Sequence, residues 1–226
     1  MSDKKNVLII GGHGKVALKL APLLVRDGFS VHSLIRDPDQ SEDITKTGAN
    51  PVVKDVASLT AEEWDELLIG VDAIVWSAGA GGKGGTEATY AVDRDAAIAS
   101  IDAAQRSENS PRYIMVSFWG STTVDLPEDN SLYHYSLAKR AADHHLLDSS
   151  LDFAILAPTA LTMERAKGID VHTVEDTANQ ERPADTSREL VAHVAAYEVE
   201  APTAPNKIIP FADGDSQLGD ALGSVS

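Results

Sequence analysis

Short apolar runs alternate with stretches of helical spacing along most of this 226-residue chain. The runs with the composition of buried strands are residues 7–10, 30–35, 52–53, 73–77, 113–117, 153–156 and 207–211. Continuous apolar runs of this length are typical of strands covered on both faces of a parallel sheet. Strands that alternate with helices form right-handed βαβ units. The sequence therefore predicts an α/β fold, a single Rossmann-like doubly wound parallel sheet with helices on both faces.

The segments between the runs carry helix signals. The first helical stretch stops at Gly28, and glycine readily adopts the left-handed conformation that caps a helix end. Thr60 and Glu63 have the spacing of a capping box and predict a helix start. The helices predicted after the first are residues 60–68, 93–107, 136–148 and 187–197. Residues 162–186 are polar and aperiodic, and we expect them to cover the carboxyl edge of the sheet, where such folds bind ligands.

A glycine-rich turn, GGHGKVA, follows the first predicted strand and precedes the first predicted helix. Gly11 permits the tight turn, Gly14 lets the backbone approach a pyrophosphate, and the small Ala17 allows close helix–strand packing. The helix N-terminus then presents free N–H groups and its positive dipole end to the phosphates. The turn predicts a dinucleotide-binding site with contacts from Gly11, His13, Gly14, Lys15 and Val16.

The end of the second predicted strand favours NADP(H) over NAD(H). NAD-specific sites usually place a carboxylate there, which binds the 2′-hydroxyl of the ribose. Here Ile35 is followed by Arg36, and a guanidinium can pair bidentately with a 2′-phosphate. Asp37 comes next, but the cation stands closer to the strand end.

Composition excludes several other classes of protein. The formal net charge of −16 argues against nucleic acid and against an anionic membrane as partners. The absence of cysteine excludes disulfides, a thiolate nucleophile and a zinc–thiolate site. No apolar run approaches the roughly 20 residues that span a bilayer. We therefore expect a cytoplasmic protein with a small-molecule partner and no metal.

These motifs resemble the atypical short-chain dehydrogenase/reductases of the NmrA-like or NAD(P)H-binding group, over residues 7–158. The resemblance rests on the glycine turn, Arg36, Asp55 after the third strand, SAGAGG after the fourth, YIMVS in the fifth, and a Tyr-x-x-x-Lys pattern. It implies a single NAD(P)-binding Rossmann domain over residues 1–226, whose substrate side is formed by residues 157–226. The fourth and fifth helices are a usual dimer surface in related folds, so a homodimer is a further expectation.

The resemblance also implies roles for individual cofactor-binding residues. Asp55 and Val56 would border the adenine. The ribose side of the cofactor would be lined by Ser77, Ala78 and Gly79. Pro158, in the loop after the sixth strand, would lie near the nicotinamide.

Tyr135 and Lys139 are the candidate catalytic pair. Residues four apart share one face of a helix, so the Lys139 ammonium can lie beside the Tyr135 phenol and the cofactor ribose. A neighbouring cation is expected to lower the pKa of the phenol. Ser117 matches the first serine of the family's Ser-Ser pair, whereas Phe118 stands where the catalytic hydroxyl should be. Either Ser117 or Ser121 replaces that hydroxyl, or the protein does not reduce carbonyl groups.

Two functions therefore stay open. The first is an NADP(H)-dependent oxidoreductase that acts on a small organic substrate, and the Tyr135–Lys139 pair favours it. The second is a non-catalytic module of NmrA-like type that senses NADP(H), and the missing serine favours it. A flavin- or biliverdin-reductase-like activity, which does not need the full triad, is a variant of the first. Fold alone does not choose among them.

Overall fold

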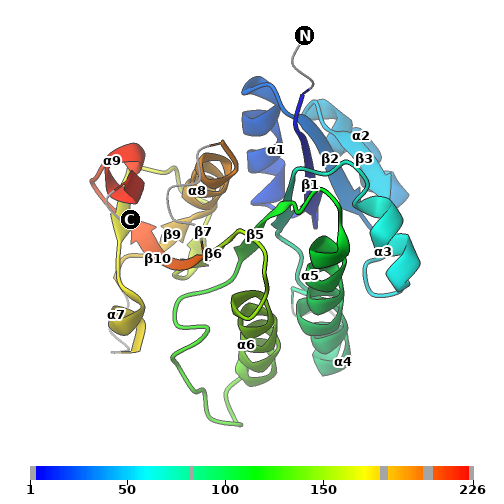
Figure 1. Cartoon of the computed structure of the whole chain (residues 1–226). Helices are drawn as coiled ribbons and strands as arrows, with labels where there is room; N and C mark the ends of the chain where they lie inside the picture. The colour runs from blue at the N-terminus through cyan, green and yellow to red at the C-terminus, as the bar shows by residue number, and fades with distance from the viewer. Residues whose placement is uncertain (1–3, 82–83, 179–182, 201–205, 224–226) are drawn as a thin grey trace.

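The computed structural model describes residues 4–81, 84–178, 183–200 and 206–223. Its centre is a mostly parallel eight-stranded sheet in the order β3-β2-β1-β4-β5-β6-β10-β8, flanked by helices (Figure 1). The strands of this sheet are β1 (Asn6–Ile10), β2 (Ser30–Ile35), β3 (Asn50–Val53), β4 (Ala73–Trp76), β5 (Arg112–Val116), β6 (Phe153–Pro158), β8 (Ile169–Val171) and β10 (Lys207–Asp213). The predicted α/β fold is confirmed, and each predicted strand lies close to its expected bounds.

The strand order reverses beside β1. The chain runs outward from β1 through β2 to β3 and then returns to pair β4 with the other side of β1. In open α/β sheets a crevice forms at such a reversal, outside the carboxyl ends of the strands. This topology places the segments that follow β1 and β4 next to each other.

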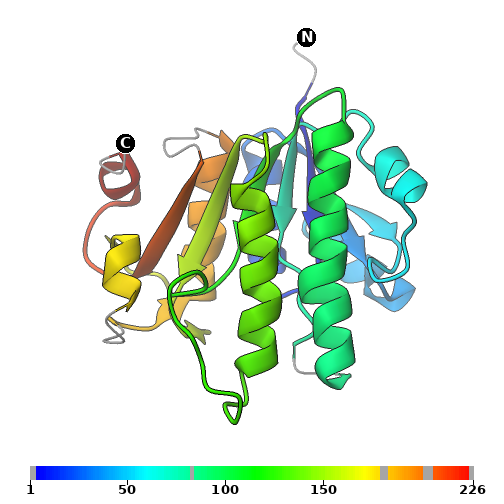
Figure 2. The same cartoon turned by 60° about the horizontal axis from the view of Figure 1, so that its bottom comes forward.

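Two helical layers cover the sheet. Helices α1 (Ala17–Arg26) and α8 (Arg188–Glu200) pack together on one face, and their apolar side chains form one buried cluster with the sheet. Helices α3 (Ala61–Leu67), α5 (Ala97–Arg106) and α6 (Tyr133–Leu147) cover the other face (Figure 2). None of the helices that the structure describes is long and apolar enough to cross a membrane.

The two helix boundaries that were predicted from capping residues are confirmed. Gly28, just past the end of α1, has a φ of +97°, the left-handed conformation expected of a cap. Thr60 and Glu63 form both hydrogen bonds of the capping box at the start of α3. The remaining short helices are the 3₁₀ helix η1 (Pro38–Gln40), α2 (Ser41–Lys46), α4 (Gly85–Thr89), α7 (Val174–Ala178) and α9 (Leu218–Gly223).

The predicted helix over residues 93–107 was too short. The observed helical stretch begins with α4 and passes through a π-helical segment, η2 (Tyr90–Ala96), before it continues as α5. A π-helical turn is wider than an α-turn, so the apolar spacing of 3.6 residues does not reveal it. Asp93 lies in this segment and is 1% exposed.

The sheet is not wholly parallel, because β8 pairs with the end of β10 in antiparallel orientation. β8 and α7 both lie in residues 162–186, which were expected to be aperiodic, together with part of a small parallel ladder between β7 (Leu161–Thr162) and β9 (Thr186–Ser187). These elements are too short to produce a periodic signal. Some positions of the segments named in the sequence analysis lie outside the described residues. This applies to the ranges 1–226, 157–226 and 162–186 and to SAGAGG, residues 77–82.

A buried ion pair joins the amino end of the sheet to α8. Arg112 donates from Nη2 to Glu198 Oε2 at 2.7 Å and from Nη1 to Asp152 Oδ1 at 2.5 Å. Glu198 is fully buried, and burial raises the pKa of its carboxyl group against the influence of Arg112. Removal of one partner of a buried ion pair leaves the other charge without compensation.

Replacement of Glu198 by alanine is expected to lower the free energy of unfolding by about 1.5–3 kcal/mol, because Arg112 loses its buried carboxylate partner and keeps only Asp152 as a counter-charge. Urea denaturation measures the loss. The control is Glu66→Ala, at an exposed position on α3, which should change the free energy by no more than about 0.5 kcal/mol. Similar losses in the two variants would contradict a structural role for the pair.

Candidate functional site

The turn after β1 passes directly against the segment after β4. Gly11 has a φ of +83°, and a Cβ at this position would lie 2.6 Å from the Cα of Ala78. No side chain fits at that distance, so only glycine allows the contact. Gly14 closes the turn by donating its N–H to the carbonyl of Gly11 at 2.8 Å.

Helix α1 begins immediately after this turn. Its N-cap residue, Val16, makes no side-chain capping hydrogen bond. Leu18 and Lys19 donate their N–H groups to the carbonyls of Gly14 and Val16, whereas the N–H groups of Val16 and Ala17 have no partner among the described residues and remain available to an anion beside the turn. The Val16 side chain packs into the buried cluster under α1, so the contact expected from this residue is limited to its backbone.

A cavity of about 500 Å³ opens beside the turn, within the usual size range of ligand sites. The predicted cofactor-binding residues that line it are Gly11, His13, Gly14, Lys15, Arg36, Asp55, Val56, Ser77, Ala78 and Gly79. The sequence analysis missed other lining residues, including Gln40, Lys54, Ala80 and Val92. The segments after β1, β2, β3 and β4, together with Ala88 and Val92 of the following helical stretch, thus form the walls of one cavity.

The cavity is lined by cations although the chain as a whole is strongly acidic. Lys15, Arg36 and Lys54 line it, whereas Asp55 is the one carboxylate among its lining residues. The Asp55 carboxylate already accepts the N–H of Ala57 at 3.1 Å. A glycine turn with available N–H groups and a surplus of cations fits a ligand that carries several phosphate charges, as a nicotinamide dinucleotide does.

Arg36 and Lys15 are exposed cations of this site, and neither has a side-chain partner among the residues that the structure describes. Asp37 forms no ion pair with Arg36 in the described structure, and its carboxylate caps η1 by accepting the N–H of Asp39 at 3.0 Å. His13 differs from Arg36, since its ring contacts Asp43 at 3.1 Å.

Lys139 and Pro158, expected at the ribose and near the nicotinamide, are not among the residues that line this cavity. Lys139 is 1% exposed, and its Nζ donates to the carbonyl of Val116 at 2.9 Å. Pro158 ends β6 inside the sheet, where its carbonyl accepts the N–H of Trp119 at 2.7 Å. Both residues are therefore held by backbone contacts beneath the site.

Tyr135 and Lys139 lie one turn apart on α6, as their spacing predicted. Tyr135 is half-buried, and its ring centroid lies 5.5 Å from that of Phe118. Burial raises the pKa of Tyr135 above its ordinary value, and the carboxyl groups of Asp93 and Asp143 raise it further. The structure thus reverses the expected direction, because burial and the two carboxyl groups all raise the pKa of Tyr135.

Both serine candidates face Asp143. Ser117 is 5% exposed, and its Oγ donates to Asp143 Oδ2 at 2.5 Å. A hydroxyl group has one proton to donate, so Ser117 has none left for a substrate carbonyl. Ser121 is also buried, and its hydroxyl lowers the pKa of the same carboxyl group. Ser117 is thus not free to replace the missing hydroxyl, whereas Ser121 Oγ makes no hydrogen bond within the described part of the chain.

Two buried carboxyl groups accompany Lys139. Asp143 follows it by one helical turn, and Asp93 comes from η2. Burial lowers the pKa of Lys139, whereas Asp143 and Asp93 raise it, so the two carboxyl groups help to keep the ammonium charged. Asp93 also accepts the N–H of Ala80 at 2.9 Å and thereby holds the cavity wall after β4.

The sequence carried a signal for only one of these acids. The four-residue spacing from Lys139 to Asp143 could have identified Asp143, because it places both on one helix face. Asp93 had no comparable signal, since it lies in the π-helical segment. In the described part of the chain, no three side chains of metal-binding type gather into one group.

Asp143→Asn tests the state of this buried carboxyl group. Burial raises the pKa of Asp143 above its unfolded value, against the opposing influence of Lys139, Ser117, Ser121 and His144. The stability contributed by the protonated acid is therefore complete below the unfolded pKa of 3.8 and is lost as pH rises through the folded pKa.

Relative to the Asp143→Asn variant, the wild-type protein should thus lose stability with rising pH, by at most about 1.4 kcal/mol per pH unit. Urea denaturation of both proteins across a pH series measures this difference. If the difference in the free energy of unfolding between the two proteins stays constant, or grows in favour of the wild type as pH rises, the pKa of Asp143 is not raised.

Residues 11–202 match the NAD(P)H-binding family. This range includes the glycine turn, the cation after β2 and the acidic residues around Lys139. A UPF0659 protein of Schizosaccharomyces pombe is 33% identical to the chain over 183 residues, which cover 71% of this chain and 72% of that protein.

Two solved structures share nearly the whole fold. A Bacillus halodurans protein, provisionally assigned as a NAD-dependent epimerase/dehydratase, has a TM-score of 0.85 and 29% identity, with coverage of 97% of this chain and 99% of that one. The oxidoreductase ylbE of Lactococcus lactis has a TM-score of 0.81 and 28% identity, with coverage of 97% and 96%. The chain therefore belongs to the NAD(P)H-binding family, as its resemblance to the atypical short-chain dehydrogenase/reductases implied, and its ligand is a nicotinamide cofactor.

Proposed function

We propose that this protein is an NADP(H)-dependent oxidoreductase that acts on a small organic substrate. The observation that carries the cofactor preference is the position of Arg36, directly after β2, where NAD-specific sites usually have a carboxylate. Its guanidinium lines the cavity and has no acidic partner among the described residues. Guanidinium groups bind phosphate bidentately, which suits Arg36 to the 2′-phosphate of NADP(H).

The remaining cofactor contacts follow from the walls of the cavity. Asp55 and Val56 would border the adenine, and the ribose side would be lined by Ser77, Ala78 and Gly79. The α1 N-terminus and the glycine turn would hold the pyrophosphate. All of these residues line the cavity, which supports the assignment.

Tyr135 is the proposed proton donor of the reaction. When bound, a nicotinamide cofactor supplies or accepts a hydride. The raised pKa of Tyr135 keeps its phenol protonated at neutral pH, so its Oη holds a proton that a reduced substrate needs. Lys139, fixed on the Val116 carbonyl, favours the phenolate once the proton has left. Ser117 acts through Asp143 and does not touch the substrate in this proposal.

A second function has an observation of its own in its favour. The Phe118 side chain cannot hydrogen-bond a carbonyl, and the Ser117 hydroxyl already donates its hydrogen bond to Asp143. A module that binds NADP(H) and reports its redox state to a partner needs neither hydroxyl. The relatives assigned as an oxidoreductase and, provisionally, as an epimerase/dehydratase support the catalytic proposal, which we therefore place first.

Arg36→Ala tests the cofactor preference. The variant should bind NADPH about ten- to a hundredfold more weakly, because a charge-assisted hydrogen bond to the 2′-phosphate is lost. NADH affinity should change by no more than about twofold, since NADH lacks that phosphate. Titrations that follow nicotinamide fluorescence measure both. Equal effects on the two cofactors, or no NADPH binding by the wild type, would refute the assignment.

Tyr135→Phe separates an enzyme from a sensor. With carbonyl or quinone substrates, kcat should fall about 10²- to 10⁴-fold, the usual contribution of general acid catalysis, while NADPH affinity is retained. Tyr197→Phe, the same change on α8, is the matched control and should leave kcat unaltered. If the wild type binds NADPH but turns over none of these substrates, the sensing function replaces the catalytic one.

A further inference from the structure

Lys54 lies beside Arg36 on the wall of the cavity. Its N–H donates to the carbonyl of Ile35 at 3.0 Å and continues the ladder in which Ile35 pairs with Val53. Residues that lie opposite each other on neighbouring strands project to the same face of the sheet. Arg36 and Lys54 are the next pair along this ladder, and both line the cavity. Two cations therefore converge at the end of β2, although the sequence analysis identified only Arg36.

The Lys54 ammonium has a counter-charge of its own. Glu63 Oε1 lies 3.4 Å from Lys54 Nζ, and the two side chains are 35% and 43% exposed. Glu63 Oε2 accepts the N–H of Thr60 at 3.0 Å in the capping box of α3. That hydrogen bond, together with Lys54, holds the pKa of Glu63 below its ordinary value, so the Glu63 carboxyl group is ionised at neutral pH.

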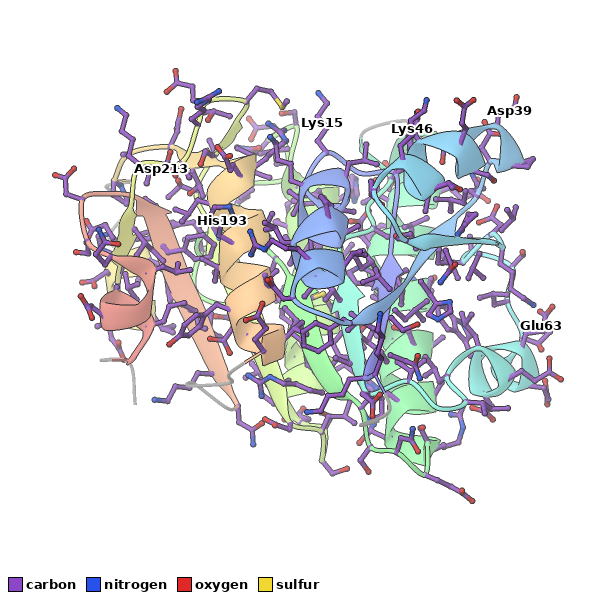
Figure 3. All side chains as sticks on the ribbon, turned by 90° about the horizontal axis from the view of Figure 1, so that it is seen from above. Lys15, Asp39, Lys46, Glu63, His193 and Asp213 are labelled. Atoms are coloured by element: carbon purple, nitrogen blue, oxygen red, sulfur yellow. The ribbon has the colours of Figure 1, made fainter. Side chains whose placement is uncertain are left out.

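Figure 3 shows where the Glu63 carboxylate lies. Glu63 lies near the start of α3, well separated from Lys15 at the start of α1. The Glu63 charge therefore interacts with Lys54, on the side of the cavity that Arg36 also lines. The side around Lys15, where we place the pyrophosphate, is distant from Glu63. Arg36 itself has no acidic partner among the described residues, so Lys54 is the cation that Glu63 controls.

We propose that Lys54 is a second cation for the 2′-phosphate of NADP(H) and that Glu63 is its internal competitor. This inference rests on the proposed NADP(H) preference and names a further residue that determines it. An exposed ion pair is weak, and a phosphate monoester with about two negative charges attracts the ammonium more strongly than one carboxylate does. Binding of NADP(H) exchanges the Glu63 contact for a phosphate contact. NAD(H) has no such phosphate and leaves the pair intact.

The two partners of the pair should change NADPH affinity in opposite directions. Lys54→Gln should weaken NADPH binding about tenfold, because a charged contact to the phosphate is lost. Glu63→Gln should strengthen it about two- to threefold, because glutamine keeps the capping box but no longer competes for Lys54. In the Lys54→Gln background, Glu63→Gln should have little further effect, since no ammonium remains to be released.

The experiment is a fluorescence titration of the full chain and each variant with NADPH and, in parallel, with NADH. Lys46→Gln is the matched control, because it removes the same charge from an exposed lysine of α2 that does not line the cavity. NADH affinity should stay within about twofold in every variant, and so should NADPH affinity in the control. Circular dichroism verifies that each variant is folded.

The outcomes separate the inference from the proposed function. If the wild type prefers NADPH but Lys54→Gln binds it normally, or no more weakly than Lys46→Gln does, the role of Lys54 is refuted and the function stands. Weaker NADPH binding by Glu63→Gln would refute the competition. If the wild type binds neither cofactor, or both equally well, the proposed NADP(H) preference itself fails.

Discussion

The close approach of two backbone segments at Gly11 is the constraint on which the rest of the site depends. A side chain at this position would collide with the backbone of Ala78, so glycine is the residue that lets the turn after β1 pass against the segment after β4. That contact narrows the crevice created by the reversal of strand order. The α1 N-terminus, the cations after β2 and β3, and residues 77–81 are then grouped around one cavity.

Charge is distributed in two ways around this crevice. The exposed cations stand out in a chain with a formal net charge of −16, and they suit an anionic ligand. Beneath them, Lys139 lies near two buried acids, Asp93 and Asp143, which help to keep it charged. The same acids raise the pKa of Tyr135. The exposed charges are therefore suited to binding, and the buried carboxyl groups disfavour the phenolate form of Tyr135.

Prediction from the sequence succeeded where the signal was local. The apolar runs identified the strands, and the glycine turn identified the wall of the cavity nearest α1. The spacing of Thr60 and Glu63 identified the start of α3. Prediction failed where an element was too short or too irregular to leave a period, as for β8 and η2. The partner of Ser117 was not predicted either, because nothing in its own segment shows that its hydroxyl faces a buried acid.

The sequence by itself determined the alternation of strands and helices, the phosphate-binding turn and the cation after β2, because turn chemistry and apolar spacing act between near neighbours. The tertiary structure alone decided the partners of the functional side chains. The strand order places Lys54 beside Arg36, and the packing of α6 on β5 turns Ser117 toward Asp143. These contacts join residues that are far apart in the chain, so they depend on how the elements pack and not on any local pattern.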